Sequence, residues 1–438
     1  MKQHAEKVAL VDQSGEHDYQ TLIDQIDTYY NELSMTVSAG DSVAILSDYS
    51  FQSVALFLAL TKLKTIIIPI VTKVEDEISE RLEEGYVDWV LNLSDKLIIN
   101  SRASKEKHHL IQTLQQEKKA GLILFSSGST GKPKAMIHNL DNLIDSYKGR
   151  KPKKLSILVF LMFDHIGGLN TLLNSLTMGA KIIIPGTRDA DEVSQLIEKY
   201  KVNVLPASPT FLNLMLIGNT PERYDLSSLK MITYGTEAMP ESLLLRLKKT
   251  FPKVRFLQTF GTSETGIAQT TSRSSTSLEI KLGDPNQEYK IVDGELWLRS
   301  KTQVLGYLNV PMNSFTEDGW FKTGDLVEET EDGFLKIVGR NKEIINVGGE
   351  KVLPVEVESV LLEMEDINDC MVYGEKNAIT GQTVVVDVVP SQLVDKKTIK
   401  KAIRQYCRER LDGYKIPTKI NIMERTNFGD RFKKLRLK

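Results

Sequence analysis

A loop rich in glycine, hydroxyl and lysine side chains follows an apolar stretch near residue 121. Residues 121–140 read GLILFSSGSTGKPKAMIHNL. Glycines permit sharp turns that let backbone N–H groups converge on phosphate oxygens, and hydroxyls and ammonium groups add donors and positive charge. The composition therefore predicts a phosphate-binding loop. Its candidate residues are Ser126, Ser127, Gly128, Ser129, Thr130, Gly131, Lys132 and Lys134.

This loop is not the P-loop of common nucleotide triphosphatases. That loop requires GxxxxGK[ST], in which the residue after the lysine holds magnesium. Here Pro133 follows Lys132, and Ser126 stands where the first glycine is required. Protein-kinase motifs do not appear in the sequence either. A kinase-like transferase, which would release ADP, is therefore disfavoured.

The surrounding sequence predicts elements that could position such a loop. Apolar β-branched runs alternate with amphipathic helical stretches, for example a strand at 42–48, a helix at 50–64 and a strand at 65–71. Strand–helix–strand repetition of this kind predicts parallel sheets covered by helices.

The pattern of residues changes from about Lys281. From there, short predicted strands separated by glycine and aspartate turns indicate a β-rich subdomain. After Gly339 come a charged loop, a glycine pair and a helix near 355–364, followed by a small α+β module. We therefore predict an α/β protein. Residues 1–339 would form a large N-terminal domain of parallel-rich sheets layered with helices plus the β-rich subdomain, and residues 340–438 a small α+β C-terminal domain.

Composition excludes several classes of protein. The chain has 438 residues and a net charge of −2, so no global basic field attracts it to nucleic acid or to an anionic membrane. Lys62 and Lys64 interrupt the most apolar segment, which favours a buried helix and strand over a membrane span. Cys370 and Cys407 lack metal-binding spacing, and the N-terminus lacks a signal-peptide pattern, so we expect a cytoplasmic protein.

Residues 126–134, SSGSTGKPK, resemble the signature [ST]-S-G-[ST]-T-G-x-P-K of the adenylate-forming enzymes. This superfamily includes acyl-CoA synthetases, peptide-synthetase adenylation domains and firefly luciferase. Further family patterns recur in the family's order. They are YGTEAMP at 234–240, QTFGTSETG at 258–266, GWFKTGDL at 319–326 and GRNKEIINVGGEKVLPVEVE at 339–358.

The resemblance implies a role in ATP binding for each of these segments. The first would lie along the adenine ring, on which the flat ring of Phe260 would pack. Glu264 would coordinate Mg²⁺, Asp325 would accept hydrogen bonds from the ribose hydroxyls, and Arg340 would contact ribose or phosphate. Besides the phosphate loop, the implied ATP-binding residues are Gly235, Thr236, Glu237, Thr259, Phe260, Gly261, Thr262, Ser263, Asp325 and Arg340. Thr130 and Glu264 are also implied to be catalytic.

The resemblance also implies a two-step reaction. A carboxylate would attack the α-phosphate of ATP, pyrophosphate would leave, and a pantetheine thiol would then attack the acyl-adenylate to give a thioester. No carrier domain is recognisable in the chain, so the acceptor is expected to be CoA or a separate carrier protein. Lys342 would lie at a hinge between the domains, and Gly348 and Gly349 would help form the thiol tunnel.

The C-terminus departs from the family pattern. The family carries a catalytic lysine in a run like [RK]-T-x-x-G-K, but the run beginning at Arg425 places Asp430 where that lysine is expected. A carboxylate there would repel both reacting anions, and losing one such donor costs about 10²–10³ in rate. Lys433 is our candidate replacement, with Lys434 and Arg431 as alternatives. A catalytically impaired nucleotide-binding relative remains open.

Residues 158–173, LVFLMFDHIGGLNTLL, resemble the family segment that lines the acyl pocket. An aromatic-His-x-x-Gly pattern is frequent there in acyl- and aryl-CoA synthetases, and HIGGL fits it. The alternative treats Phe163–Asp164 as the Phe-Asp pair of amino-acid-activating domains, in which the aspartate binds the substrate amine. The candidate pocket residues are Phe163, Asp164, His165, Gly167 and Gly168. The sequence does not name the acid.

Overall fold

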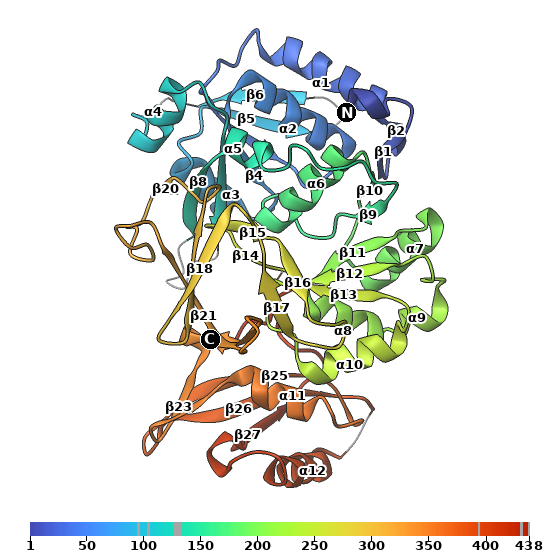
Figure 1. The fold of residues 1–438 in the computed structure, drawn as a ribbon, viewed down its shortest axis with the longest axis vertical. Coiled ribbons are helices and arrows are strands. Elements are labelled where there is room, and N and C mark those ends of the chain that lie inside the picture. Colours follow the sequence, from blue (N-terminus) through green and yellow to red (C-terminus); the bar gives the residue numbers. More distant parts are fainter. Residues whose placement is uncertain (94–96, 103–105, 127–132, 393–394, 430–431, 437–438) are drawn as a thin grey trace.

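The computed structural model describes residues 1–93, 97–102, 106–126, 133–392, 395–429 and 432–436. Residues 127–132 of the predicted phosphate loop lie outside this set, as do Asp430 and Arg431. Figure 1 shows two helix-covered sheet lobes, a β-rich sheet beside them and a smaller C-terminal domain at the end of the molecule. The predicted α/β architecture is confirmed.

The first lobe is built on a sheet in the order β20-β8-β7-β4-β3-β5-β6. Its centre is parallel, because β3 pairs in parallel with β4 and β5, and β4 pairs in parallel with β7. The outer pairs are antiparallel. The strands are β3 (Ser42–Leu46), β4 (Ile66–Ile70), β5 (Trp89–Leu93), β6 (Leu97–Ser101), β7 (Gly121–Ser126), β8 (Lys134–Asn139) and β20 (Gly306–Tyr307).

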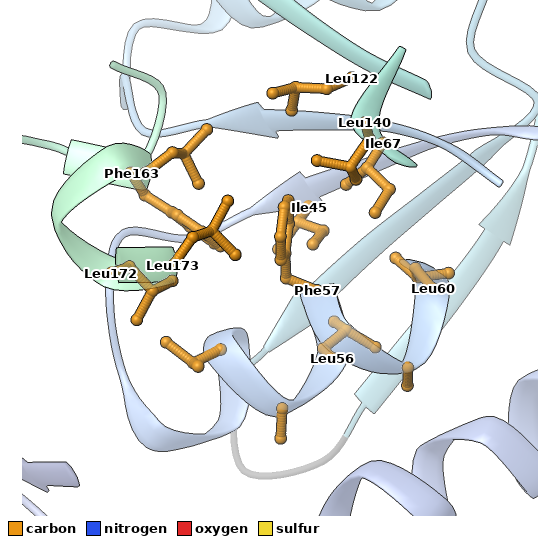
Figure 2. Close-up of a cluster of buried hydrophobic side chains, with 14 of the residues drawn as sticks. Ile45, Leu56, Phe57, Leu60, Ile67, Leu122, Leu140, Phe163, Leu172 and Leu173 are labelled. Atoms are coloured by element: carbon orange, nitrogen blue, oxygen red, sulfur yellow. The ribbon is translucent and has the colours of Figure 1, made fainter. Parts of the chain in front are cut away.

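The apolar segment interrupted by Lys62 and Lys64 forms α2 (Phe51–Leu63) followed by the buried strand β4, as predicted. Ser50 caps α2 through a reciprocal capping box with Ser53. In Figure 2, Leu56, Phe57 and Leu60 of α2 face the sheet residues Ile45 and Ile67. This packing fixes the sheet from which β7 leads into the phosphate loop.

The second lobe contains a sheet in the order β13-β12-β11-β9-β10-β1-β2, parallel except for the edge pair β1–β2. Its strands end toward the segments predicted to bind the adenine and the acid. They are β1 (Val8–Asp12), β2 (Gly15–Asp18), β9 (Ser156–Leu158), β10 (Lys181–Ile183), β11 (Val204–Ala207), β12 (Met231–Tyr234) and β13 (Arg255–Gln258).

Helices and short 3-10 turns cover these two sheets. They are η1 (Lys2–His4), α1 (Tyr19–Leu33), α3 (Glu75–Glu84), α4 (His109–Gln116), α5 (Leu140–Asp145), α6 (Ile166–Met178), α7 (Ala190–Tyr200), α8 (Pro209–Ile217), α9 (Thr220–Arg223) and α10 (Glu241–Thr250). Across the part of the chain that the structure describes, every helix is too short or too polar to span a bilayer.

The β-rich subdomain is an antiparallel sheet in the order β16-β17-β22-β21-β19-β18. It begins at Thr270, earlier than the sequence pattern indicated. The sequence did not reveal this first strand because β16 consists of hydroxyl residues and carries no apolar alternation. Its strands are β16 (Thr270–Ser272), β17 (Glu279–Leu282), β18 (Gln287–Val292), β19 (Glu295–Ser300), β21 (Phe321–Glu329) and β22 (Leu335–Arg340). A separate hairpin, β14 (Phe260–Thr262) with β15 (Gly266–Ala268), precedes it.

The C-terminal domain follows the 3-10 turn η2 (Asn341–Glu343). It packs two helices on a sheet dominated by the long β25–β26 hairpin. Helix α12 is amphipathic and buries Ile399, Ile403 and Cys407. The elements are β23 (Ile345–Val347), β24 (Glu350–Val352), α11 (Pro354–Leu361), β25 (Ile367–Asn377), β26 (Gly381–Pro390), α12 (Lys396–Arg408), η3 (Gly413–Lys415) and β27 (Lys419–Ile422).

Candidate active site

Asp325 and Arg340 form the centre of the candidate site. They are register partners on the neighbouring antiparallel strands β21 and β22, and Arg340 Nε donates to Asp325 Oδ1 at 2.7 Å. Asp325 is 4% exposed, and this burial raises the pKa of its carboxyl above the ordinary value, against the opposing charges of Arg340 and Lys433. Strand pairing thus places side by side two residues that lie more than 190 positions after the phosphate loop in the sequence.

Glu264 lies at the turn of the β14–β15 hairpin, beside this pair. Together with Asp325 and Glu343, its carboxylate raises the pKa of Arg340. Tyr307 Oη donates to Glu264 Oε1 at 3.0 Å, and the backbone N–H of Val304 donates to the Glu264 carbonyl at 2.8 Å. The side chain and the backbone of Glu264 are therefore both held in place.

The two ends of the phosphate loop are adjacent. Ser126 at the end of β7 pairs with Lys134 at the start of β8. Asn309 fixes the second end, because its Nδ2 donates to the Pro133 carbonyl at 2.8 Å and its Oδ1 accepts from the Ala135 N–H at 2.9 Å. Lys134 Nζ lies 5.0 Å from the centre of the Tyr307 ring. Lys134 and Glu264 thus both contact Tyr307, which places the second end of the loop near Glu264.

The predicted adenine segment follows β12 and lies against Thr259. A side chain at Gly235 would come within 2.6 Å of Thr259 Oγ1, so this close approach requires glycine. Thr236 has a φ of +73°. Phe260 is 7% exposed and packs in the apolar cluster of the β-rich subdomain with Ile280 and Leu296. Its stacking on adenine remains a prediction.

The remaining residues of the QTFGTSETG segment form a tightly folded hairpin. A side chain at Gly261 would come within 2.4 Å of the Gly266 carbonyl, and Thr262 Oγ1 accepts from the Thr265 N–H at 3.1 Å. Ser263 lies in the turn beside Glu264. These residues build the turn that carries Glu264, and direct contacts between them and ATP remain predictions.

The predicted acyl-pocket residues have mixed surroundings. Phe163 is fully buried and packs on Tyr49 and Phe57 in the core of the first lobe. His165 caps α6, accepting from the Gly167 N–H at 3.0 Å. A side chain at Gly168 would come within 2.3 Å of the Met162 carbonyl.

Asp164 is 4% exposed as a residue and forms an ion pair with Arg81 at 3.1 Å. This pairing neutralises the carboxylate that the amino-acid-activating alternative requires for a substrate amine. The contact therefore favours the interpretation of this segment through His165.

The two candidate lysines near the C-terminus have different surroundings. Lys434 is 7% exposed at its side chain, where Nζ lies 3.2 Å from Asp369 Oδ1 and donates to the Cys370 carbonyl at 2.6 Å. Lys433, by contrast, acts electrostatically on Asp325, the predicted ribose carboxylate. Of the two, Lys433 is the one whose charge acts on Asp325, and its catalytic role remains a prediction.

The predicted hinge and tunnel residues lie in the linker and the C-terminal domain. Lys342 is exposed in η2, directly after Arg340 and Asn341. Gly348 and Gly349 form the exposed turn between β23 and β24 and have φ values of +61° and +96°, a conformation that favours glycine. Motion about Lys342 and contact of the turn with a thiol remain predictions.

Sequence reasoning missed Tyr307 and Asn309. Both lie in the segment GYLNVP, at residues 306–311, within the stretch of short strands that the sequence predicts after about Lys281. Their signal is weak in a single sequence, because a buried tyrosine and a loop asparagine are common structural residues. Only strand pairing shows that β20 lies beside β8, where Tyr307 contacts Glu264 and Asn309, just beyond the strand, contacts the second end of the phosphate loop at Pro133.

The chemistry of the site fits a Mg²⁺ ion that arrives with a nucleotide. Within the described residues, no group of three or more His, Cys, Asp or Glu side chains is placed to hold a metal unaided. Glu264 offers one hard carboxylate, and Mg²⁺ is commonly held by one or two carboxylates together with substrate phosphates and water. Glu264 is thus suited to a metal that takes its other ligands from ATP.

Comparison with known proteins identifies the family. Residues 1–308 match the family described as AMP-binding enzyme, and residues 356–427 match the AMP-binding enzyme C-terminal domain. The chain therefore belongs to the AMP-binding enzyme family, which confirms the resemblance to adenylate-forming enzymes inferred from the motifs.

Individual relatives are CoA ligases. An indoleacetate–CoA ligase from Aromatoleum aromaticum is 30% identical over 329 residues, which cover 69% of this chain and 63% of that relative, less than two thirds of its length. A 2-succinylbenzoate–CoA ligase from Listeria monocytogenes is 26% identical over 444 residues, covering 96% of this chain and 93% of the relative. The crystal structure of an anthranilate CoA ligase with anthranoyl-AMP superposes with a TM-score of 0.84 at 21% identity, covering 99% of this chain and 93% of that one. That likeness establishes the fold.

Proposed function

We propose that this protein is an AMP-forming acid–thiol ligase. It activates a carboxylic acid with ATP to an acyl-adenylate, releases pyrophosphate, and transfers the acyl group to the thiol of CoA. The observation that carries the proposal is the convergence of Glu264, Asp325 and Arg340, with Lys134 at the end of the phosphate loop near Glu264 and Lys433 within electrostatic reach of Asp325. Membership of the AMP-binding enzyme family and the CoA ligase relatives support it.

The barrier to the first step is mostly electrostatic, because two anions must approach each other and a third must leave. Asp325 would bind the ribose hydroxyls, and the Arg340 ion pair would keep that carboxylate charged and oriented. The donors of residues 126–134 would hold the phosphates that depart. Lys433 would supply the positive charge between the carboxylate and the α-phosphate that Asp430 cannot supply.

Glu264 would hold Mg²⁺, which when bound screens the charge of the triphosphate. Tyr307 would keep the Glu264 carboxylate oriented through its 3.0 Å hydrogen bond. A metal ligand that already has its orientation fixed loses less conformational freedom when the nucleotide arrives. Tyr307 therefore belongs to the proposed site as a positioning residue.

We infer an aromatic acid as the first substrate class to test. The relatives described above are named for indoleacetate, 2-succinylbenzoate and anthranilate, each of which carries an aromatic ring. His165 and Gly168 of the predicted pocket segment suit the pattern that is frequent in acyl- and aryl-CoA synthetases. CoA is the favoured acceptor because the same proteins are named as CoA ligases. A phosphopantetheine carrier protein is the alternative. A cytoplasmic location also remains a prediction.

The test is acid-dependent exchange of pyrophosphate into ATP with a panel of aromatic, aliphatic and amino acids. It is followed by detection of thioester with CoA or with a phosphopantetheine-bearing carrier protein. The proposal expects exchange with at least one acid, formation of AMP rather than ADP, and a CoA thioester. Exchange with amino acids alone would support the amino-acid-activating alternative. No exchange with any acid, together with retained AMP binding, would identify an impaired nucleotide-binding relative.

The lysine assignment has its own test. Replacing Lys433 with Ala should lower exchange by about 10²–10³-fold, the usual cost of losing one such charge-stabilising donor. AMP binding should be largely kept, because Asp325 and Arg340 are untouched. Unchanged exchange in Lys433→Ala would remove Lys433 from the mechanism.

A further inference from the structure

The described residues near the C-terminus form a tight hairpin. The backbone N–H of Phe432 donates to the Gly429 carbonyl at 2.8 Å, Gly429 N–H donates to the Lys433 carbonyl at 3.1 Å, and Leu435 N–H donates to the Asn427 carbonyl at 3.1 Å. We call residues 426–429 and 432–436 the tail hairpin. Some of its side chains contact the C-terminal domain, one packs on the N-terminal domain, and one acts electrostatically on Asp325 of the candidate site.

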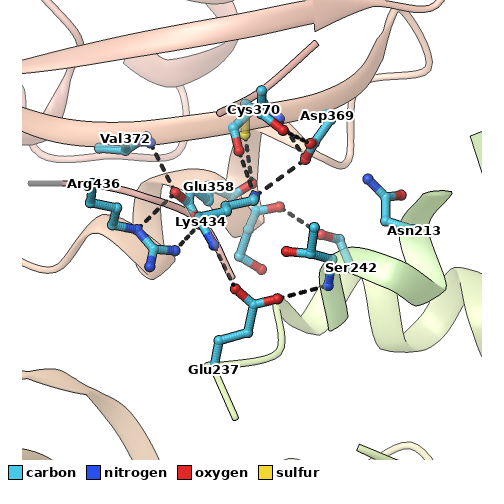
Figure 3. Close-up of polar contacts among 12 residues, drawn as sticks. Asn213, Glu237, Ser242, Glu358, Asp369, Cys370, Val372, Lys434 and Arg436 are labelled. Carbon is cyan, nitrogen blue, oxygen red and sulfur yellow. Dashed lines mark hydrogen bonds and ion pairs between the residues drawn. The ribbon is translucent and has the colours of Figure 1, made fainter. Parts of the chain in front are cut away.

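Lys434 and Arg436 fasten the tail hairpin to the C-terminal domain. Figure 3 shows both cations converging on Glu358 of α11, at 3.7 Å and 2.9 Å respectively. Lys434 also pairs with Asp369 of β25, which accepts a second hydrogen bond from the Thr426 hydroxyl. Because both cations are at most 8% exposed, salt screens these pairs much less than it screens pairs on the surface.

Phe432 fastens the same hairpin to the N-terminal domain. Its ring centre lies 5.2 Å from that of Phe160 and 5.4 Å from that of Phe211, with an edge-on angle of 82° to the second. Phe160 and Phe211 are at most 1% exposed and belong to the core of the second lobe. Aromatic pairs at such distances add specific attraction to the apolar burial.

A second contact with the N-terminal domain adjoins the first. Glu237, in the predicted adenine segment, accepts from the backbone N–H of Lys434 at 3.2 Å, and its other oxygen accepts from the Thr210 N–H at 2.7 Å. Figure 3 shows Glu237 reaching the tail hairpin from the N-terminal side. The hairpin is therefore held between the two domains at this point.

Phe432 adopts a backbone conformation that needs support from its surroundings. Its φ is +50°, in the left-handed region that is unfavourable for a residue with a side chain. The turn sends the ring into the N-terminal domain while the next residue, Lys433, lies within electrostatic reach of Asp325. The aromatic packing of Phe432 and the placement of Lys433 are thus parts of one turn.

We propose that Phe432 is a positioning residue for Lys433, docking the tail hairpin on the N-terminal domain so that Lys433 reaches the nucleotide. The inference rests on the proposed function, since it concerns the adenylation step. Docking at Phe160 and Phe211 is needed while the carboxylate attacks ATP. It is not needed once a preformed acyl-adenylate is supplied, because the charge contributed by Lys433 serves only the first step.

The experiment compares Phe432→Ala and Phe432→Leu with Leu435→Ala, a matched control at a residue of the same hairpin that is 46% exposed. Pyrophosphate exchange measures the first half-reaction. Thioester formation from chemically prepared acyl-adenylate and CoA measures the second. Amide hydrogen exchange of residues 432–436 reports docking independently of activity.

Phe432→Ala should lower the turnover of exchange on the order of 10²-fold, as expected when a catalytic group is misplaced by about an ångström. The KM for ATP and the second half-reaction should stay close to wild type, and hydrogen exchange of the hairpin should speed up. Phe432→Leu should recover part of the loss because it restores apolar bulk, and it carries the test if Phe432→Ala fails to fold. Leu435→Ala should match wild type.

The inference is overturned if Phe432→Ala keeps wild-type exchange, or if both half-reactions fall by the same factor in a folded variant. It is also overturned if hairpin hydrogen exchange in Phe432→Ala equals that of Leu435→Ala. A wild-type protein inactive with every acid would refute the proposed function instead. The hydrogen-exchange comparison would still decide whether Phe432 docks the hairpin.

Discussion

Replacing Glu358 with Gln should open the C-terminal domain by removing one charge from a buried ionic cluster. Glu358 is 1% exposed, accepts from the Val372 N–H at 2.9 Å, and faces the cations of Arg436 and Lys434. Burial alone would raise the pKa of this carboxyl, but the two cations overcome that effect and lower it below its ordinary value. Glu358 is therefore ionised in the folded protein.

The expected magnitude follows from what the substitution leaves behind. Gln keeps an oxygen for the Val372 N–H but leaves Lys434 and Arg436 buried with less negative charge nearby. Breaking a buried pair by removing one partner typically costs about 3–5 kcal/mol. Glu356→Gln is the matched control in the same helix. The Glu356 side chain is 42% exposed and pairs with Lys415 at 2.7 Å, so the loss of its charge should cost at most about 1 kcal/mol.

The assay uses the two cysteines of the chain, Cys370 and Cys407, because both lie fully buried in the C-terminal domain. A thiol reagent can modify them only when that domain opens, so the labelling rate under native conditions reports its opening equilibrium. Since every 1.4 kcal/mol is tenfold, a loss of about 3–5 kcal/mol should accelerate labelling of Glu358→Gln roughly 10²- to 4 × 10³-fold. Equal labelling rates in Glu358→Gln, Glu356→Gln and wild type would refute the stabilising role of the cluster.

Three further predictions concern the N-terminal domain. Tyr307→Phe removes the hydrogen bond to Glu264 while keeping the ring beside Lys134. It should therefore weaken the binding of Mn²⁺ in the presence of an unreactive ATP analogue, as measured by electron paramagnetic resonance. Unchanged Mn²⁺ binding would show that Tyr307 does not orient Glu264. Because burial raises the pKa of Asp325, this carboxyl gains its proton at a higher pH than an ordinary aspartate. The affinity of the wild type for AMP, measured by calorimetry, should therefore fall on acidification. In Asp325→Asn the affinity for AMP should hardly change with pH. Burial lowers the pKa of His138 to about 4. Between about pH 6.5 and pH 4 the unfolded chain therefore binds one more proton than the folded chain. As the pH falls through this range, the free energy of unfolding should decrease by up to about 3 kcal/mol. Urea unfolding of His138→Gln, compared with wild type at pH 7 and pH 4.5, should show a smaller acid loss, and identical losses would contradict this account.

Much of the architecture could be predicted from local patterns. The segment 50–71 was predicted as a helix and a buried strand because its apolar run is broken by two lysines and ends near a proline, and it forms α2 and β4. The start of the β-rich subdomain could not be predicted as well. Strand β16 owes its conformation to pairing with β17, and its threonines and serine carry no periodic signal of their own.

The candidate site also has features that the sequence predicts and features that depend on the tertiary structure. Glu264, Asp325 and Arg340 were identified from ordered motifs, but their proximity comes from the pairing of β21 with β22 and from the β14–β15 turn. Lys433 and Lys434 are adjacent and chemically identical in the sequence. Lys434 lies in a buried ionic cluster, whereas the charge of Lys433 acts on Asp325, and both follow directly after the left-handed residue Phe432.

The sequence by itself determined the family, the alternation of strands and helices, and the types of side chain available for binding ATP. Those features reside in local periodicity and in short motifs, which need no knowledge of distant residues. Only the tertiary structure decided that Lys434 is held in a buried ionic cluster, that Tyr307 contacts Glu264 and Asn309 contacts Pro133, and that Asp164 is paired with Arg81. Each of these depends on contacts between residues more than 40 positions apart in the chain, which only the packing of whole elements brings together.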